Sequence, residues 1–208
     1  LETKFGANII FLEDPTRRKL TQALNNLKKE LEPNDTLLVY YAGHGYLDES
    51  TGEGYWLPVD AEVDEDTFWV SNNYLMNKLK TYKSKNILLI SDSCFSGSII
   101  TRSLQRIVDT QPKDALEKYL RTPSRVVISS GGLKPVLDGG AGEHSIFAKS
   151  FLGVIDELSG PITSAELYTR LRDRVTSRAL ELGVDQTPLR GEITGAGHEG
   201  PDFVLIPN

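Results

Sequence analysis

The sequence contains only one cysteine among its 208 residues. One cysteine cannot form an internal disulfide, and a lone thiol that must stay reduced suits a reducing compartment. The sequence also lacks a run of about 18 apolar residues that could span a bilayer, and residues 1–4 show neither the charged nor the apolar part of a signal peptide. We therefore expect a cytoplasmic protein whose single cysteine, Cys94, requires an explanation.

Basic residues are fewer than acidic ones, 23 against 29, so the formal net charge is −6 at pH 7. Such a chain offers no broad basic surface to neutralise phosphates, which argues against nucleic acids and anionic membranes as partners. A basic protein or peptide fits this charge better. The apolar fraction of 39% and the charged fraction of 25% are ordinary for a globular protein, and we expect one domain over residues 1–208.

Five short apolar stretches have the length of β-strands. Three of them, residues 36–42, 87–91 and 125–129, are apolar almost without alternation. This pattern is typical of parallel strands that are buried on both faces. The other two strands are predicted at residues 8–12 and 202–206.

Apolar residues from Leu20 to Leu31 recur at the helical period and predict a helix. Asp14 and Pro15 suit its cap and first turn, and Pro33 ends it. Three further helices are predicted near residues 72–82, 145–158 and 163–182. Because strands and helices alternate, we predict an α/β fold with a mainly parallel central sheet and helices on both of its faces.

Chemically reactive side chains follow two of the predicted strands. The strand at residues 36–42 leads directly into Gly43, His44 and Gly45, and the strand at residues 87–91 leads into Asp92, Ser93 and Cys94. In parallel sheets the carboxyl ends of the strands form the functional edge, so His44 and Cys94 would meet there if their strands are neighbours.

A cysteine that attacks a carbonyl needs a base nearby, and imidazole has a suitable pKa near neutrality. We therefore predict that His44 and Cys94 act as a catalytic pair, with the amides of Gly45 and Cys94 binding the oxyanion. A lone cysteine after an apolar strand is more often a small core residue. The polar flanks of Cys94, Asp92 and Ser96 among them, argue against this alternative.

The Gly-His-Gly motif is followed, 50 positions after His44 (94 − 44), by Asp-Ser-Cys-Phe-Ser-Gly at residues 92–97. This pair of motifs resembles the caspase-like peptidases of family C14, whose His and Cys have about the same separation. The setting of the cysteine is most similar to that of metacaspases and their bacterial relatives. The resemblance extends over most of the chain and implies a caspase-like three-layer sandwich. Family members carry one more strand and helix upstream of the position of Asn8, which this sequence lacks.

The resemblance implies cleavage of peptide bonds through an acyl-enzyme, in which Cys94 attacks and His44 protonates the leaving amine. No cofactor would be consumed. Asp92 matches the acid of metacaspases that selects Arg or Lys before the scissile bond. Ser129 and Ser130, on a later strand, are predicted to contact the substrate as well.

Asp138 is a further candidate for the substrate pocket. It falls about where true caspases carry an arginine that binds aspartate, and an acid there would favour basic substrates. Lys134 lies in the same loop and would counteract this charge, in which case a small or apolar residue would be preferred. An exposed loop carboxylate is an equally good interpretation of Asp138.

Residues 43–77 contain no lysine or arginine but many acidic residues, namely Asp48, Glu49, Glu53, Asp60, Glu62, Asp64, Glu65 and Asp66. Such a run is usually a solvated face, and it could also steer basic substrates or bind calcium. The sequence has no EF-hand spacing, so calcium activation is the weaker alternative. His144 and His198 lack metal-ligand spacing and are expected to be structural.

By the same resemblance, residues 1–97 correspond to a large subunit, residues 98–124 to an inter-subunit linker and residues 125–208 to a small subunit. Basic residues in the linker are candidate sites of self-cleavage. The expected partners are a protein or peptide substrate and a regulatory domain or activating protease. A non-enzymatic scaffold with this fold is the alternative function. A nucleotide-binding domain is disfavoured because the first predicted strand leads into acidic residues rather than a glycine-rich loop.

Overall fold

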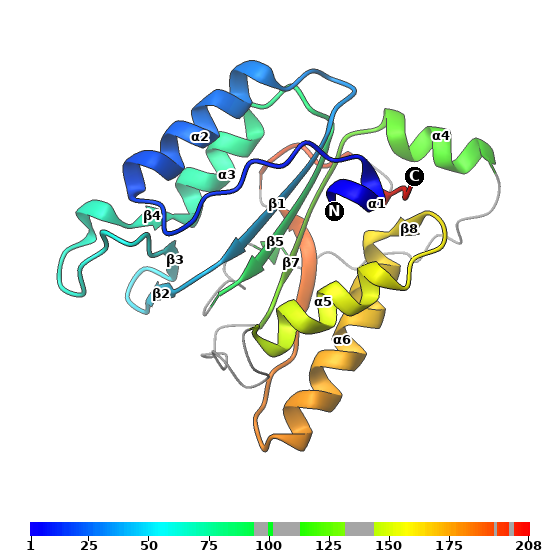
Figure 1. Cartoon of the computed structure of the whole chain (residues 1–208). Helices are drawn as coiled ribbons and strands as arrows, with labels where there is room; N and C mark the ends of the chain where they lie inside the picture. Colours follow the sequence, from blue (N-terminus) through cyan, green and yellow to red (C-terminus); the bar gives the residue numbers. More distant parts are fainter. Residues whose placement is uncertain (94–99, 102–112, 132–143, 194, 200–201) are drawn as a thin grey trace.

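The computed structural model describes residues 1–93, 100–101, 113–131, 144–193, 195–199 and 202–208, and within them a five-stranded sheet forms the centre (Figure 1). The strands lie in the order β1 (Thr36–Ala42), β5 (Asn86–Asp92), β7 (Ser124–Ser129), β9 (Leu189–Ile193) and β6 (Ile100–Thr101). β1, β5 and β7 are parallel, whereas β9 runs antiparallel to both of its neighbours. The predicted parallel strands at residues 36–42, 87–91 and 125–129 are thereby confirmed.

The central strand β5 is buried along its whole length because its side chains serve two apolar cores. Leu88 and Ile90 pack in one core, and Ile87 and Leu89 pack in the other. Successive side chains of a strand point to opposite faces, so a strand covered on both faces needs apolar residues at every position. This explains the apolar run that the sequence shows there.

Helices cover both faces of the sheet, which makes the three layers of the sandwich (Figure 1). The helices are α2 (Arg17–Glu30) and α3 (Asn72–Lys80) on one face and α5 (Ile146–Asp156) and α6 (Ser164–Glu181) on the other. A hydroxyl side chain accepts a backbone N–H bond at the start of each of them, from Thr16, Ser71, Ser145 and Thr163. These caps fix where the helices begin.

The start predicted for the first long helix was wrong by a few residues. Thr16, not Asp14, caps α2, because its Oγ1 accepts the N–H of Lys19 at 3.3 Å. Asp14 instead has a positive φ of 41° and lies in the turn that leads into the helix. Pro15 therefore precedes the cap rather than occupying the first turn.

The strand predicted at residues 8–12 does not form. Ile10 is 53% exposed and Phe11 is 79% exposed. β1 lies at the edge of the sheet, and within the described ranges no strand pairs with its outer side. A cavity of about 630 Å³, lined by Ile9, Ile10 and Leu37 among others, lies there instead. A strand needs a partner for its N–H and C=O groups, and residues 8–12 pair neither with the outer side of β1 nor with another strand of the described ranges.

Two small sheets were not predicted. β2 (Gly45–Asp48), β3 (Glu53–Trp56) and β4 (Val70–Ser71) form an antiparallel sheet beyond the end of β1 (Figure 1). β8 (Ile162–Thr163) and β10 (Val204–Leu205) form the other. The strand predicted at residues 202–206 is thus shorter than expected and pairs outside the central sheet.

Three short helices complete the described chain: α1 (Glu2–Phe5), the 3₁₀ helix η1 (Asp66–Phe68) and α4 (Lys113–Arg121). α4 lies within residues 98–124, the stretch that we expect to link the two subunits. No helix in the described ranges is long and apolar enough to cross a membrane.

Candidate active site

The carboxyl ends of β1, β5 and β7 meet at one edge of the sheet, as the sequence predicts. β1 and β5 are in register, with Ala42 opposite Asp92, and the N–H of Gly43 donates to the Asp92 carbonyl at 3.3 Å. At the end of β7, the N–H of Ser130 donates to the Ser91 carbonyl at 2.9 Å. The segments that lead to His44 and Cys94 therefore leave the sheet side by side.

His44 is exposed and lies between β1 and β2, where its backbone is held from two sides. Its carbonyl accepts the Tyr41 hydroxyl at 2.7 Å and the Leu57 N–H at 3.0 Å. The ring of Tyr41 is itself fixed by stacking on Trp56, with centroids 4.0 Å apart and planes 3° from parallel. The imidazole is thus carried on a rigid backbone although its side chain reaches solvent.

Gly43 is required by this close packing. A Cβ at this position would lie 2.8 Å from the Tyr41 hydroxyl and 3.0 Å from the ring carbon that bears it. Burial raises the pKa of Tyr41 well above its usual value, so the hydroxyl stays protonated and remains a donor to His44. The glycine before the histidine therefore serves the positioning of His44.

Asp92 is a buried carboxylate, 8% exposed, at the last position of β5. Its Oδ2 accepts the Tyr40 hydroxyl at 3.3 Å and the Ser145 hydroxyl. Ser145 also caps α5, because its Oγ accepts the Ala148 N–H at 2.8 Å. Burial and the charge of Asp92 raise the pKa of Tyr40, which keeps that hydroxyl a donor. Hydroxyls from two layers of the fold thus orient one carboxylate.

The predicted substrate contacts Ser129 and Ser130 are buried, each 0% exposed. The Ser129 hydroxyl donates to the Gly131 carbonyl at 2.8 Å, and that of Ser130 donates to the Ser93 carbonyl at 3.4 Å. Gln186, also buried, donates to the Ser130 carbonyl at 3.0 Å. In this structure the two hydroxyls therefore bind the protein backbone, and a contact with substrate stays a prediction.

Two predicted site residues, Cys94 and Asp138, lie outside the described residues, as does Lys134. Gly45, predicted for the oxyanion hole, is the first residue of β2 and lies opposite Trp56. His144 is exposed beside Ser145. The structure thus brings His44, Gly45 and Asp92 to the same edge of the sheet.

The described part of the chain contains no group of three or more His, Cys, Asp or Glu side chains arranged to hold a metal ion. Some acidic side chains of residues 43–77 accept hydrogen bonds from neighbouring residues; the Asp48 carboxylate, for example, accepts bonds from Ser50 and Thr51. These bonds lower the pKa of Asp48. Calcium activation stays a prediction without a geometric site.

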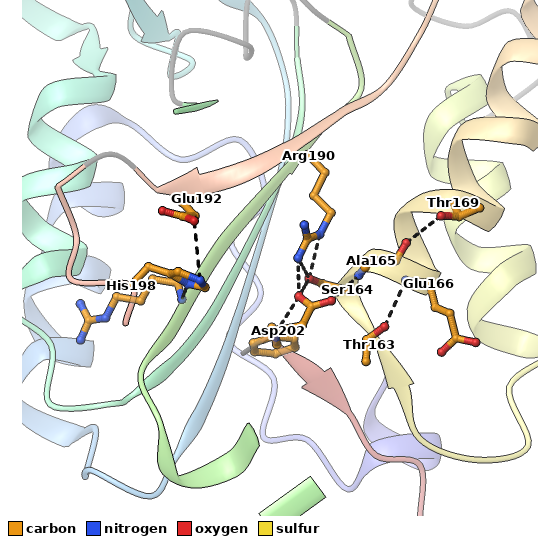
Figure 2. Close-up of polar contacts among 11 residues, drawn as sticks. Thr163, Ser164, Ala165, Glu166, Thr169, Arg190, Glu192, His198 and Asp202 are labelled. Carbon is orange, nitrogen blue, oxygen red and sulfur yellow. Dashed lines mark hydrogen bonds and ion pairs between the residues drawn. The ribbon is translucent and has the colours of Figure 1, made fainter. Parts of the chain in front are cut away.

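Two partly buried polar clusters hold segments of the C-terminal half of the chain together (Figure 2). The guanidinium of Arg190 on β9 pairs with Asp202, and both bind Ser164 at the start of α6. His198 accepts the N–H of Arg125 on its Nδ1 at 3.0 Å, which ties residues 195–199 to β7. This contact gives His198 a structural role.

Sequence reasoning overlooked the residues that position the site: Tyr40, Tyr41, Ser145 and Gln186. A signal for the first two was available, because two tyrosines interrupt an otherwise mainly aliphatic strand, and a tyrosine hydroxyl that is withdrawn from solvent needs a hydrogen-bond partner. Ser145 could be predicted only as a helix cap. Its contact with Asp92 depends on how α5 packs against β5.

The comparisons with known proteins agree on one family. The sequence model of the caspase domain of Peptidase C14 matches residues 1–191. Metacaspase-1A of Aspergillus terreus is 28% identical over 81% of this chain, and Metacaspase-6 of Arabidopsis thaliana is 31% identical over 48% of it. The aligned part covers 41% and 28% of those two proteins, so the chain spans less than half of their length.

A solved structure shows the same fold. The crystal structure of a protein from Geobacter sulfurreducens superposes with a TM-score of 0.55 over 89% of this chain and 77% of that one, at 18% sequence identity. At this identity the likeness concerns the arrangement of the strands and helices alone.

Proposed function

Because the chain belongs to the caspase domain family, Peptidase C14, whose members are cysteine-type peptidases, we propose that it cleaves peptide bonds with Cys94 as nucleophile and His44 as acid and base. The register of β1 and β5 is the observation that supports this proposal most. Ala42 lies opposite Asp92 at the ends of the two strands, and in the sequence His44 and Cys94 each come two residues after these positions. This register supports the expectation that the two residues meet at one edge of the sheet.

In the proposed reaction, His44 takes the thiol proton of Cys94, and the thiolate attacks the carbonyl carbon of the scissile bond. His44 then gives the proton to the leaving amine as the carbon–nitrogen bond breaks. Water, deprotonated by His44, attacks the thioester, and the departing thiolate recovers the proton. The N–H groups of Gly45 and Cys94 are proposed to stabilise the oxyanion.

We further propose that Asp92 selects Arg or Lys before the scissile bond. The Asp92 carboxylate is two residues before Cys94 and is held in one orientation by Tyr40 and Ser145. A fixed carboxylate of low exposure forms a strong charge-assisted bond to a guanidinium, because little water competes for it. The roles of Ser129, Ser130 and Asp138 in the same pocket stay predictions.

The test is the initial cleavage rate on fluorogenic peptides that differ only in the residue before the bond, with and without calcium. Turnover of Arg or Lys peptides that is lost in Cys94→Ala and in His44→Ala supports the mechanism. Asp92→Asn, which keeps the shape of the side chain, should then lower kcat/KM for basic peptides and leave other peptides unaffected. If the Asp92→Asn variant still prefers basic peptides, another acidic residue must select Arg or Lys.

The alternative function, a scaffold without catalysis, predicts a different result. In that case, folded protein would cleave no peptide of the panel, either with or without calcium. Binding of a partner would then be unchanged in Cys94→Ala. Circular dichroism of each variant shows whether a loss of rate reflects loss of the fold.

A further inference from the structure

The outer face of the small sheet carries a cluster of three aromatic rings, Tyr46 of β2, Tyr55 of β3 and Trp69 just before β4. The ring of Trp69 lies 4.7 Å from that of Tyr46 and 5.4 Å from that of Tyr55. Tyr46 is 42% exposed, while the inner face of the same sheet buries Gly54 and Trp56. We call the outer face, with Asp48 and Glu53, the aromatic face.

Two carboxylates of the aromatic face lie at opposite positions of the strand pair, which is an unfavourable arrangement. Asp48 lies directly opposite Glu53, two pairs along the strands from Tyr46 and Tyr55 and therefore on the same side of the sheet. Like charges at opposite positions destabilise a strand pair. Within the described part of the chain neither carboxylate has an ion-pair partner. The repulsion would be relieved by a cation that binds this face from outside.

The electrostatic field at the cluster is negative. The pKa of Tyr55 is raised by burial and then by the charges of Glu53, Asp48 and Asp66, which shows that three carboxylates act on the same ring. Between residues 43 and 77 the sequence has no lysine or arginine. Arg17 reaches this region, but its Nε donates to the Trp69 carbonyl at 3.1 Å rather than to a carboxylate.

The aromatic face is also continuous with the candidate active site. His44 is followed directly by Gly45, the first residue of β2, and by Tyr46. A peptide that extends from the scissile bond along β2 would therefore meet the rings and carboxylates within a few residues. A second copy of this chain does not fit, because its net charge is −6 and the two copies would repel each other.

We propose that the aromatic face is a docking surface for a basic, extended segment of the substrate outside the residues next to the scissile bond. Arg or Lys side chains stack on the rings of Tyr46 and Trp69, and Asp48 and Glu53 pair with their charges. This inference rests on the proposed peptidase function and adds to it a requirement for basic residues beyond the one that Asp92 selects.

Direct binding tests the surface without catalysis. The Cys94→Ala variant is titrated with a peptide carrying several arginines and with the same peptide carrying glutamines, and tryptophan fluorescence is followed. Binding should change the fluorescence of Trp69, whereas Trp56, which is 2% exposed, should not respond. The fluorescence change should therefore be absent in the Trp69→Phe variant. The arginine peptide should bind, more weakly at higher salt. A signal that the glutamine peptide produces equally would overturn the proposal.

Substitutions on the aromatic face test whether the arginine peptide binds there. Asp48→Asn with Glu53→Gln keeps the side-chain shape and one of the two acceptor oxygens of each side chain, and should weaken binding of the arginine peptide about fivefold. Tyr46→Leu should weaken it roughly two- to fivefold through loss of the cation–π contact. Glu2→Gln with Glu199→Gln removes the same charge from exposed sites elsewhere and should leave binding unchanged. Equal weakening by this control would show a nonspecific effect of net charge and refute the surface.

Cleavage separates this inference from the proposed function. The ratio of kcat/KM for a substrate with a basic extension to that for a short substrate should fall in the Asp48→Asn, Glu53→Gln variant. If neither substrate is cleaved by the unmodified chain but the arginine peptide still binds, the peptidase proposal fails and the docking surface stands. If both substrates are cleaved with the same ratio in all variants, the docking surface fails alone.

Discussion

Substitution of Asp202 by Asn is expected to destabilise the protein more than any exposed charge change. The Asp202 carboxylate accepts bonds from Arg190, from Ser164 and from the N–H groups of Ala165 at 2.7 Å and Phe203 at 2.8 Å (Figure 2). The side chains of Arg190 and Asp202 are 4% and 11% exposed. Asn keeps the size of the side chain but leaves the guanidinium buried without a counter-charge.

The size of the effect follows from burial. Breaking a buried ion pair by removing one charge costs about 3–5 kcal/mol, because the remaining ion has lost its water and its partner. Proteins of this kind have a total stability of about 5–15 kcal/mol. The loss should therefore be a large part of the total and should lower Tm by about 6–20 °C for a chain of this length.

Urea unfolding followed by circular dichroism measures the change. The matched control is Glu157→Gln, which breaks the pair with Arg174 at exposed side chains, 59% and 39%, and should cost less than about 1 kcal/mol. The double variant Arg190→Met, Asp202→Asn should lose less than the sum of the two single variants, because no charge is left buried. A loss for Asp202→Asn as small as that of the control would refute this reasoning.

Three further predictions concern the candidate site and its surroundings. Tyr41→Phe removes the donor to the His44 carbonyl while keeping the stacked ring. We expect kcat to fall severalfold with KM nearly unchanged. An unaltered kcat would contradict a positioning role of Tyr41. Ser145→Ala removes a donor to Asp92 and should weaken preference for basic peptides, whereas Ser145→Thr should retain it; equal loss in both variants would point to the packing of α5 instead. Stability should fall in alkali, because desolvation raises the pKa of three tyrosines well above the usual 10, namely the partly buried Tyr40 and Tyr41 and the buried Tyr82. Their contribution is complete below about pH 10 and is lost above it at about 1.4 kcal/mol per pH unit each, since the unfolded chain releases these protons first. Tyrosinate absorbance should show three of the eight tyrosines resisting titration until the fold is lost; full titration of the folded protein would contradict this.

The sequence by itself determined the fold class and the place of the site. Strands buried on both faces have a direct signature, because every position must be apolar, and the regular alternation with helices leaves few other arrangements. The reactive residues were found for a related reason: His44 and Asp92 break off the apolar runs of their strands, and such a change from apolar to polar or reactive side chains at a strand end indicates a functional edge. The motif pair then identified the family.

Only the tertiary structure decided which residues hold the site in place. The bonds from Ser145 to Asp92 and from Gln186 to Ser130 join residues 53 and 56 positions apart in the sequence. The bond from Tyr41 to His44 is local, but the tyrosine ring is held in place by its stacking on Trp56. Residues 8–12 are a second case in which the tertiary structure was decisive, because here it overturned the prediction of a strand. Their sequence is that of a strand, but β-structure needs a partner, and pairing is settled in three dimensions rather than by the apolar pattern alone.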